Sequence, residues 1–294
     1  MKDVSNARLL WSSLTHLKYD RMNHDTMGFT LETTVDAVLQ EEMAAYAEAT
    51  NDPNPRYQGD GAVMPPLLIS RFVFPLIKRI MILPELRMNI LRMVHATQSF
   101  RWYKPIKVGD CLAVSVKISG FEDTRAGELM TLTGQLTRDG EVVGEATAGV
   151  MVRGKKKGGP AGEKPRKETP PPRVERFRVE IPTTGDQALR YAAASGDTNF
   201  IHTNNFLAKL VGLPRTILHG LCVLAMANAA MTDKVLNGEV EKSAGIAGRF
   251  NLPTLPGQTL TLVAYEGGSD KEIPYEVLNP KGKVVIRDGV FRLA

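Results

Sequence analysis

Apolar residues recur at helical spacing in several segments of the chain, and they do so in both halves. An amphipathic pattern from about Ala37 to Ala49 predicts a first helix. Longer apolar runs near Pro66 to Met81 and near His219 to Leu236 predict two long helices. A capping-box pattern from Thr184 to Gln187 predicts the start of a further helix.

Alternating apolar and polar positions predict strands after each long helix. The first such strand of each half follows a glycine: CLAVSVKIS comes after Gly109, and TLTLVAYE comes after Gly257. Turn signals at Asp139-Gly140 and at residues 279–282 separate further alternating runs. A shorter helix, a long helix and then an antiparallel meander indicate a curved sheet wrapped around its helix, an α+β arrangement.

The two halves repeat the same signals at a nearly constant distance. Tyr46 is followed six residues later by Asp52, and Tyr191 is followed six residues later by Asp197, an offset of 145 residues in both cases. The glycines that precede the strands are 148 residues apart. A pattern that recurs at this distance indicates a duplicated domain.

A segment rich in Gly, Pro and Lys separates the halves. Residues 154–174 contain almost no large apolar side chain, which is typical of an extended connector. We therefore expect a domain at 1–153, a linker at 154–175 and a second domain at 176–294. Residues 153–176 carry a net charge of +6 against +5 for the whole chain, so the rest of the chain has no basic excess. No aromatic residue interleaves these charges, and nucleic acid is not expected as a partner.

The remaining composition indicates a cytoplasmic protein without a membrane span. The start of the chain lacks the pattern of a secretory signal. Prolines and charged residues interrupt the apolar stretch 72–91, which excludes it as a transmembrane helix. Cys111 and Cys222 lie far apart in apolar segments, so we expect buried free thiols and neither a disulfide nor a zinc site.

The chemistry-bearing residues are concentrated between Tyr191 and His219. Asp197, Asn199 and His202 lie there in a polar cluster between two apolar helical stretches. A carboxylate beside an imidazole supplies the proton removal and proton delivery that addition of water to a double bond requires, and the Asn199 amide would anchor either group. The alternative is structural: Asp197 and Asn199 form a turn or a helix cap, and His202 satisfies a buried contact.

A second candidate group follows at the start of the long helix. Gly220 lets a ligand approach the backbone, so its N–H would polarise a thioester carbonyl and stabilise the enolate formed during hydration. The alternative is that Gly220 is only a close-packing point at a helix start.

The order of these residues resembles a known family. YAAASGDTNFIH at 191–202 with TILHG at 216–220 is similar to the hydratase 2 motif of the MaoC-like enoyl-CoA hydratases, which have the hot-dog fold. HATQSFRWYKPIKVGDCLAVSVKI at 95–118 resembles the N-terminal hot dog of the two-domain members. Phe200 and Thr216 depart from the motif, because each stands where proline is usual. The resemblance implies a double hot-dog protein.

The resemblance also implies roles for individual residues. Asp197 and His202 would hold and activate the water, Asn199 would support them, and Gly220 would donate to the thioester carbonyl. Substrate-binding roles would fall to Tyr191, Ser195, Gly196 and His219. Family members use no metal or redox cofactor, and coenzyme A is part of the substrate.

The first half is expected to have lost its own site. Asn54 matches Asn199, but Tyr57 takes the position of His202, and Pro65-Pro66 replaces His219-Gly220. In two-domain relatives such a half accommodates a longer acyl chain. The side chains that would suit a tunnel wall are Phe72, Phe74, Leu76, Ile77, Ile80 and Met81, with Phe72 and Ile77 as the expected substrate contacts. Ordinary core packing is the alternative for all six.

The predicted reaction is (R)-specific hydration of trans-2-enoyl-CoA to (R)-3-hydroxyacyl-CoA, reversible as dehydration. One alternative is a dehydratase that acts on 3-hydroxyacyl groups bound to an acyl carrier protein. A noncatalytic acyl-thioester-binding subunit is another, and a thioesterase of the same fold is less favoured. We expect one active site per chain, in a homodimer of double hot-dog chains or in a pseudo-dimeric monomer.

Overall fold

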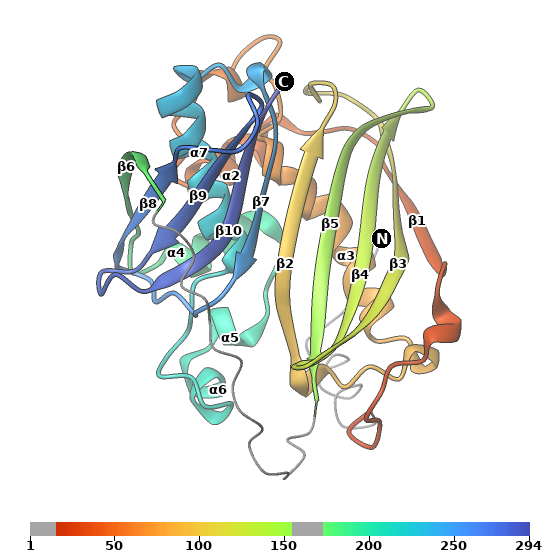
Figure 1. Ribbon diagram of the computed structural model, residues 1–294. Coiled ribbons are helices and arrows are strands. Elements are labelled where there is room, and N and C mark those ends of the chain that lie inside the picture. The colour runs from red at the N-terminus through yellow and green to blue at the C-terminus, as the bar shows by residue number, and fades with distance from the viewer. Residues whose placement is uncertain (1–15, 155–172) are drawn as a thin grey trace.

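A computed structural model describes residues 16–154 and 173–294 of the chain (Figure 1). The expected linker lies almost wholly outside these residues and stays a prediction. The last strand of the first half ends at Arg153, and the first strand of the second half begins at Glu175.

Both halves contain one strand, a shorter helix, a long helix and four further strands, and the second half has two additional short helices. The first half contains β1 (Thr30–Val35), α2 (Gln40–Ala49), α3 (Ile69–Met81), β2 (Met93–Trp102), β3 (Leu112–Thr124), β4 (Gly127–Arg138) and β5 (Glu141–Arg153). The second half contains β6 (Glu175–Pro182), α4 (Gln187–Ser195), α5 (Phe200–Thr203), α6 (Asn205–Leu210), α7 (Gly220–Leu236), β7 (Ser243–Phe250), β8 (Thr259–Tyr265), β9 (Glu272–Leu278) and β10 (Val284–Leu293).

The strands form one ten-stranded sheet in the order β1-β3-β4-β5-β2-β7-β10-β9-β8-β6. The order of the second half is the mirror image of the first, and β2 pairs with β7 in antiparallel fashion where the halves meet. Ser99 lies opposite Ala247 in this pairing, and the two are also equivalent by the 148-residue offset. A local twofold axis therefore passes between them.

Each half of the sheet curves around one long helix, α3 in the first half and α7 in the second (Figure 1). This arrangement confirms the predicted α+β double hot-dog fold. The two long helices lie where the apolar runs predict them, since α3 follows a 3-10 turn at Pro66–Leu68 and α7 begins directly after His219.

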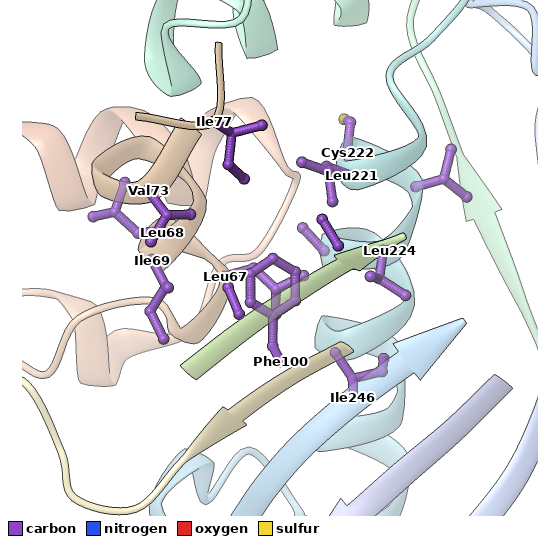
Figure 2. Close-up of a cluster of buried hydrophobic side chains, with 14 of the residues drawn as sticks. Leu67, Leu68, Ile69, Val73, Ile77, Phe100, Leu221, Cys222, Leu224 and Ile246 are labelled. Carbon is purple, nitrogen blue, oxygen red and sulfur yellow. The ribbon is translucent and has the colours of Figure 1, made fainter. Parts of the chain in front are cut away.

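The hydrophobic core continues from one half into the other. Figure 2 shows Phe100 of β2 between Val73 on α3 and Leu224 on α7, close to Ile246 of β7. Phe100 and Ile246 are directly opposite each other across the β2–β7 pairing, and both are buried. Burial of each such side chain contributes about 1.5–3 kcal/mol, so the halves stabilise each other.

Some local expectations need correction. The helix expected from Ala37 begins at Gln40, and the helix expected from Thr184 begins at Gln187, although the Thr184 N–H does donate to Gln187 Oε1 at 3.1 Å. Cys111 is exposed rather than buried, because it lies in the turn that precedes β3, at the surface of the sheet. Cys222 is buried and free, as expected.

Within the described ranges 16–154 and 173–294, no helix combines the length and apolarity that a membrane crossing requires.

Candidate active site

A cavity of about 560 Å³ lies between the two halves. From the second half it is lined by Asp197, Asn199, His202, His219, Gly220 and Phe250, among others. The wall from the first half includes Phe74, Ile77, Lys78, Met81, His95 and Gln98. All four residues expected to be catalytic therefore face one space, together with side chains that lie more than 100 residues away in sequence.

Asp197 is held by its backbone just beyond the end of α4. Its N–H donates to Ser195 Oγ at 3.2 Å, and its carbonyl accepts from His219 Nε2 at 2.9 Å. One carboxylate oxygen accepts from the Asn199 N–H at 3.3 Å. The side chain remains 16% exposed, so the carboxylate is fixed and still reachable.

His202 presents a free ring nitrogen. Its Nδ1 lies 2.8 Å from the Ile217 carbonyl, and because a carbonyl only accepts, the proton is on Nδ1. Nε2 therefore keeps its lone pair. Burial lowers the pKa of His202 below its ordinary 6.5, while the charge of Asp197 opposes that shift. At neutral pH the imidazole is uncharged and ready to accept a proton.

Asn199 has the structural role that the sequence left open. Its side-chain oxygen accepts from the Ile201 N–H at 3.3 Å and caps α5, the short helix that carries His202. Asn199 also lines the cavity, so capping and a contact with a ligand are compatible.

His219 connects the segment that contains Asp197 and His202 to the core. Its ring stacks on His202 with the ring centroids 3.7 Å apart and contacts Tyr191 at 4.9 Å. Burial, reinforced by His202, lowers its pKa well below 6.5, so His219 is neutral and donates from Nε2 to the Asp197 carbonyl. Its buried Nδ1 has no hydrogen-bond partner among the described residues.

Gly220 is the first residue of α7, where backbone N–H groups have no acceptor within the helix. A Cβ added at this position would lie 2.7 Å from the ring of Phe250, so only glycine fits. The free N–H groups and the positive end of the helix dipole meet the cavity here, which favours a developing negative charge on a bound oxygen.

Asp197, His202 and His219 also form a cluster in which one ligand atom from each lies within 4.8 Å of the others. Carboxylate and imidazole are metal ligands. The two histidine rings are stacked, and His219 Nε2 is occupied by the Asp197 carbonyl at 2.9 Å. That nitrogen would have to release the carbonyl before it could bind an ion, and the metal-free site stays a prediction.

Tyr191, Ser195 and Gly196 lie behind Asp197 and are not among the residues that line the cavity. The Tyr191 hydroxyl is 3.4 Å from that of Tyr46, its equivalent in the first half. Ser195 Oγ donates to the Tyr191 carbonyl at 2.7 Å while it accepts from Asp197. These residues support the loop that carries Asp197, and a direct contact between them and a substrate stays a prediction.

The expected tunnel wall divides into two sets. Phe74, Ile77 and Met81 line the cavity. Phe72, Leu76 and Ile80 are buried in the core around α3 and do not line it. The helical periodicity identified the apolar residues of α3, and the structure assigns only one face of the helix to the cavity.

The equivalent site of the first half is closed. Tyr57 is buried and donates from its hydroxyl to Asp52 Oδ2 at 3.0 Å. Burial raises the pKa of Asp52 to about 6. Asn54 Nδ2 donates to the Gly238 carbonyl at 2.7 Å, so it joins the halves. The adjacent pocket of about 90 Å³ is too small for a substrate and is lined in part by Pro66.

Two cavity residues on β2 were not foreseen from the sequence. His95 Nε2 lies 3.1 Å from Gln98 Oε1, its ring meets Phe250 edge-on at 4.9 Å, and burial lowers its pKa. Residues three apart on a regular strand face opposite sides, but a register shift between His95 and Thr97 turns both side chains toward the cavity. The alternating pattern carries no signal for such a bulge.

Comparison with known proteins agrees with this geometry. A family described as MaoC like domain matches residues 166–281, and a family described as FAS1-like, dehydratase domain region matches residues 25–146. The chain is 31% identical over 211 residues to 3-hydroxyacyl-thioester dehydratase Y of Mycobacterium tuberculosis, covering 68% of this chain and 72% of that protein. It is 28% identical to enoyl-CoA hydratase ChsH3 of the same organism, covering 70% and 72%.

Among solved structures, a MaoC-like dehydratase from Phytophthora capsici superposes with a TM-score of 0.77 at 24% identity, covering 92% of this chain and 98% of that one. The likeness extends over both halves and the β2–β7 junction, so it concerns the whole fold.

Proposed function

This chain belongs to the MaoC-like family of hydratases and dehydratases, and we propose that it adds water reversibly to trans-2-enoyl-CoA thioesters to form (R)-3-hydroxyacyl-CoA. One observation carries the proposal. The lone pair of His202 Nε2, the Asp197 carboxylate and the N-terminus of α7 at Gly220 all face one cavity.

The first step is polarisation of the thioester. Its carbonyl oxygen accepts a hydrogen bond from the Gly220 N–H, which withdraws electrons from the conjugated double bond. The β-carbon becomes electrophilic, and the enolate oxygen that develops during attack stays at the N-terminus of α7.

Water then adds between Asp197 and His202. Its oxygen forms a bond to the β-carbon, one water proton passes to the Asp197–His202 pair, and the pair returns a proton to the α-carbon. The product contains one added water, and no oxidation or reduction takes place. The carboxylate and the imidazole act as one coupled acid–base pair, so both groups add to the same face of the double bond. We assign this to the face of the β-carbon at which attack gives the (R)-alcohol.

The reverse reaction uses the same groups. Protonation of the β-hydroxyl by the pair and loss of the α-proton release water, which makes hydratase and dehydratase activity two directions of one mechanism. The acyl chain extends along Phe74, Ile77 and Met81 of α3, in a cavity whose volume is within the range of ligand sites. This chemistry requires no metal ion and no redox cofactor.

The test is the loss of enoyl-thioester absorbance when purified protein is added to trans-2-enoyl-CoAs of increasing chain length. We expect turnover, an (R)-3-hydroxyacyl product on chiral analysis, and a length preference set by the α3 wall. An (S)-product contradicts the proposed geometry of addition. If only enoyl groups on a carrier protein are turned over, the proposed coenzyme A substrate is wrong and the carrier-protein thioester takes its place. If thioesters bind but are not turned over in either direction, the proposed activity is wrong.

A further inference from the structure

Arg71 contacts the catalytic segment from outside the cavity. It lies on α3 in the first half and is not among the residues that line the cavity. Its Nη1 nevertheless donates to the Ala194 carbonyl at 2.8 Å, three residues before Asp197. We propose that Arg71, assisted by Lys78, is a positioning residue that fixes the end of α4 and thereby the place of Asp197 beside His202. The inference rests on the hydratase function proposed above.

Arg71 joins three helices. Its Nε and Nη2 donate to Glu42 Oε1 on α2 at 3.0 and 2.9 Å, while its Nη1 reaches Ala194 on α4. The guanidinium is planar, and a carboxylate that holds one edge orients the other edge toward its acceptor. Glu42 therefore directs Arg71 at the C-terminal turn of α4.

Lys78 lies about two turns further along α3 and contacts the same end of α4. Its Nζ lies 3.4 Å from the Gly196 carbonyl, and the side chain is buried. Gly196 ends α4 in the left-handed conformation, with φ at 76°. The last carbonyls of a helix lack partners within it and carry the negative end of the helix dipole, so two cationic donors stabilise this end.

The first-half helix α2 ends in a different way. When Pro66 is aligned with Gly220, the positions on α7 that correspond to Arg71 and Lys78 are Ala225 and Thr232, and neither carries a charge. The last carbonyls of α2 are instead bound by α4, through Arg190 to Glu48 at 3.0 Å and Gln187 to Ala49 at 2.7 Å. Among residues 16–154 and 173–294, a cationic hydrogen bond from a long helix to the end of the neighbouring helix is found only between α3 and α4, beside Asp197.

The consequence for catalysis follows from the short distance between this contact and the carboxylate. Ser195 Oγ, which holds the Asp197 N–H, is in the residue directly after Ala194. If the last turn of α4 frays, both backbone restraints on Asp197 shift together. A displacement of about 1 Å at a reacting group can lower the rate about 100-fold. We therefore expect Arg71→Met to lower kcat by about 10- to 100-fold with KM within about twofold, because Arg71 does not touch the cavity.

The experiment compares Arg71→Met, Arg71→Lys and Arg79→Met with the unchanged protein. Arg79 is exposed on the same helix and provides a matched control that should retain the full kcat. Arg71→Lys keeps the positive charge and should recover part of the loss. Amide hydrogen exchange of the peptide covering residues 192–199 should become faster in Arg71→Met, while the melting temperature and the exchange of β3 and β4 stay unchanged.

Unchanged kcat together with unchanged exchange at 192–199 in Arg71→Met overturns the proposal and leaves the hydratase function standing. Faster exchange throughout the molecule with a lower melting temperature also overturns it, because Arg71 would then be a general structural contact. If the unchanged protein turns over no enoyl thioester, the hydratase function fails, and the exchange of 192–199 still decides whether Arg71 holds the segment.

Discussion

One backbone carbonyl determines which ring nitrogen of His202 carries the proton. The Ile217 oxygen fixes the proton on Nδ1, so the nitrogen with the lone pair is fixed as Nε2 before any substrate binds. His219, stacked on the same ring, is kept neutral by burial and does not compete for protons near pH 7. In the proposed mechanism the two adjacent imidazoles therefore have different tasks, one as part of the acid–base pair and one as a neutral support for Asp197.

The shift in the pKa of His202 predicts the acid limb of the pH profile. Burial lowers this pKa below 6.5, so the neutral, proton-accepting form persists at pH 6.5 and is lost only as the pH falls through the lowered value. We expect kcat/KM for hydration to stay constant from pH 8 to 6.5 and to decline below. Measurement of kcat/KM against pH checks this, and an acid limb centred at or above pH 6.5 would contradict it.

At this scale the sequence predicted the residues that are adjacent along the chain and part of the apolar wall on α3, and it missed the polar residues that the first half brings to the cavity. Asp197, Asn199 and His202 share a segment of six residues, so their convergence required only a loop. His95 and Lys78 reach the same cavity from positions more than 100 residues earlier. No local pattern indicates which strand of the first half faces the second.

In the proposed mechanism, the polarisation of the substrate depends on the N-terminus of α7. Phe250 on β7 packs against Gly220 so closely that a single added carbon meets the ring. The ring of Phe250 on β7 therefore packs directly against the backbone of α7 at Gly220. This contact places the first N–H groups of α7 at the cavity.

Gly220→Ala is expected to lower kcat by about 100- to 1000-fold, because the clash with Phe250 displaces the N–H that stabilises the enolate. The double variant with Phe250→Leu, which makes room for the methyl group, should recover part of the activity. Gly185→Ala serves as control, since a Cβ there meets nothing within 4 Å. Steady-state measurement of kcat for the three variants tests this prediction. A Gly220→Ala variant with full kcat would contradict the proposed role of the Gly220 N–H.

The elements themselves were predicted unevenly. The long helices α3 and α7 follow from their apolar runs, and β3 and β8 follow from the alternating positions after Gly109 and Gly257. The edge strands β1 and β6 were not predicted. In β1 threonine stands at three of the six positions and no residue is fully buried, so the apolar alternation there is weak. In β6 Phe177, Val179 and Ile181 do alternate with charged residues, and the signal lies directly after the polar linker segment.

The whole molecule is a duplicated structure, and in the proposed mechanism only one of its two equivalent sites is active. The hydroxyls of Tyr46 and Tyr191 meet at 3.4 Å, and Ser99 faces Ala247, so equivalent residues adjoin at the local twofold axis. The recurrence of signals at 145 and 148 residues predicted the duplication, but the pairing of β2 with β7 was not predictable. Periodicity shows which face of a strand is buried and does not specify its partner.

The equivalent site of the first half differs from that of the second half in its side chains. Tyr57 occupies the position of the imidazole and donates to Asp52, whereas Asp197 keeps its carboxylate at the open cavity. Asp52 and Asp197 lie at equivalent positions of the two halves, 145 residues apart, and differ in their surroundings. Asp52 can therefore serve as an internal control for Asp197.

The most direct test compares Asp197→Asn with Asp52→Asn, assayed in parallel for hydration of one trans-2-enoyl-CoA. Loss of the acid–base pair should lower kcat of Asp197→Asn by about 100- to 10,000-fold, while Asp52→Asn should stay within about twofold of the unchanged protein. Equal losses in the two variants, or a loss confined to Asp52→Asn, would contradict the account that the second half alone carries the chemistry.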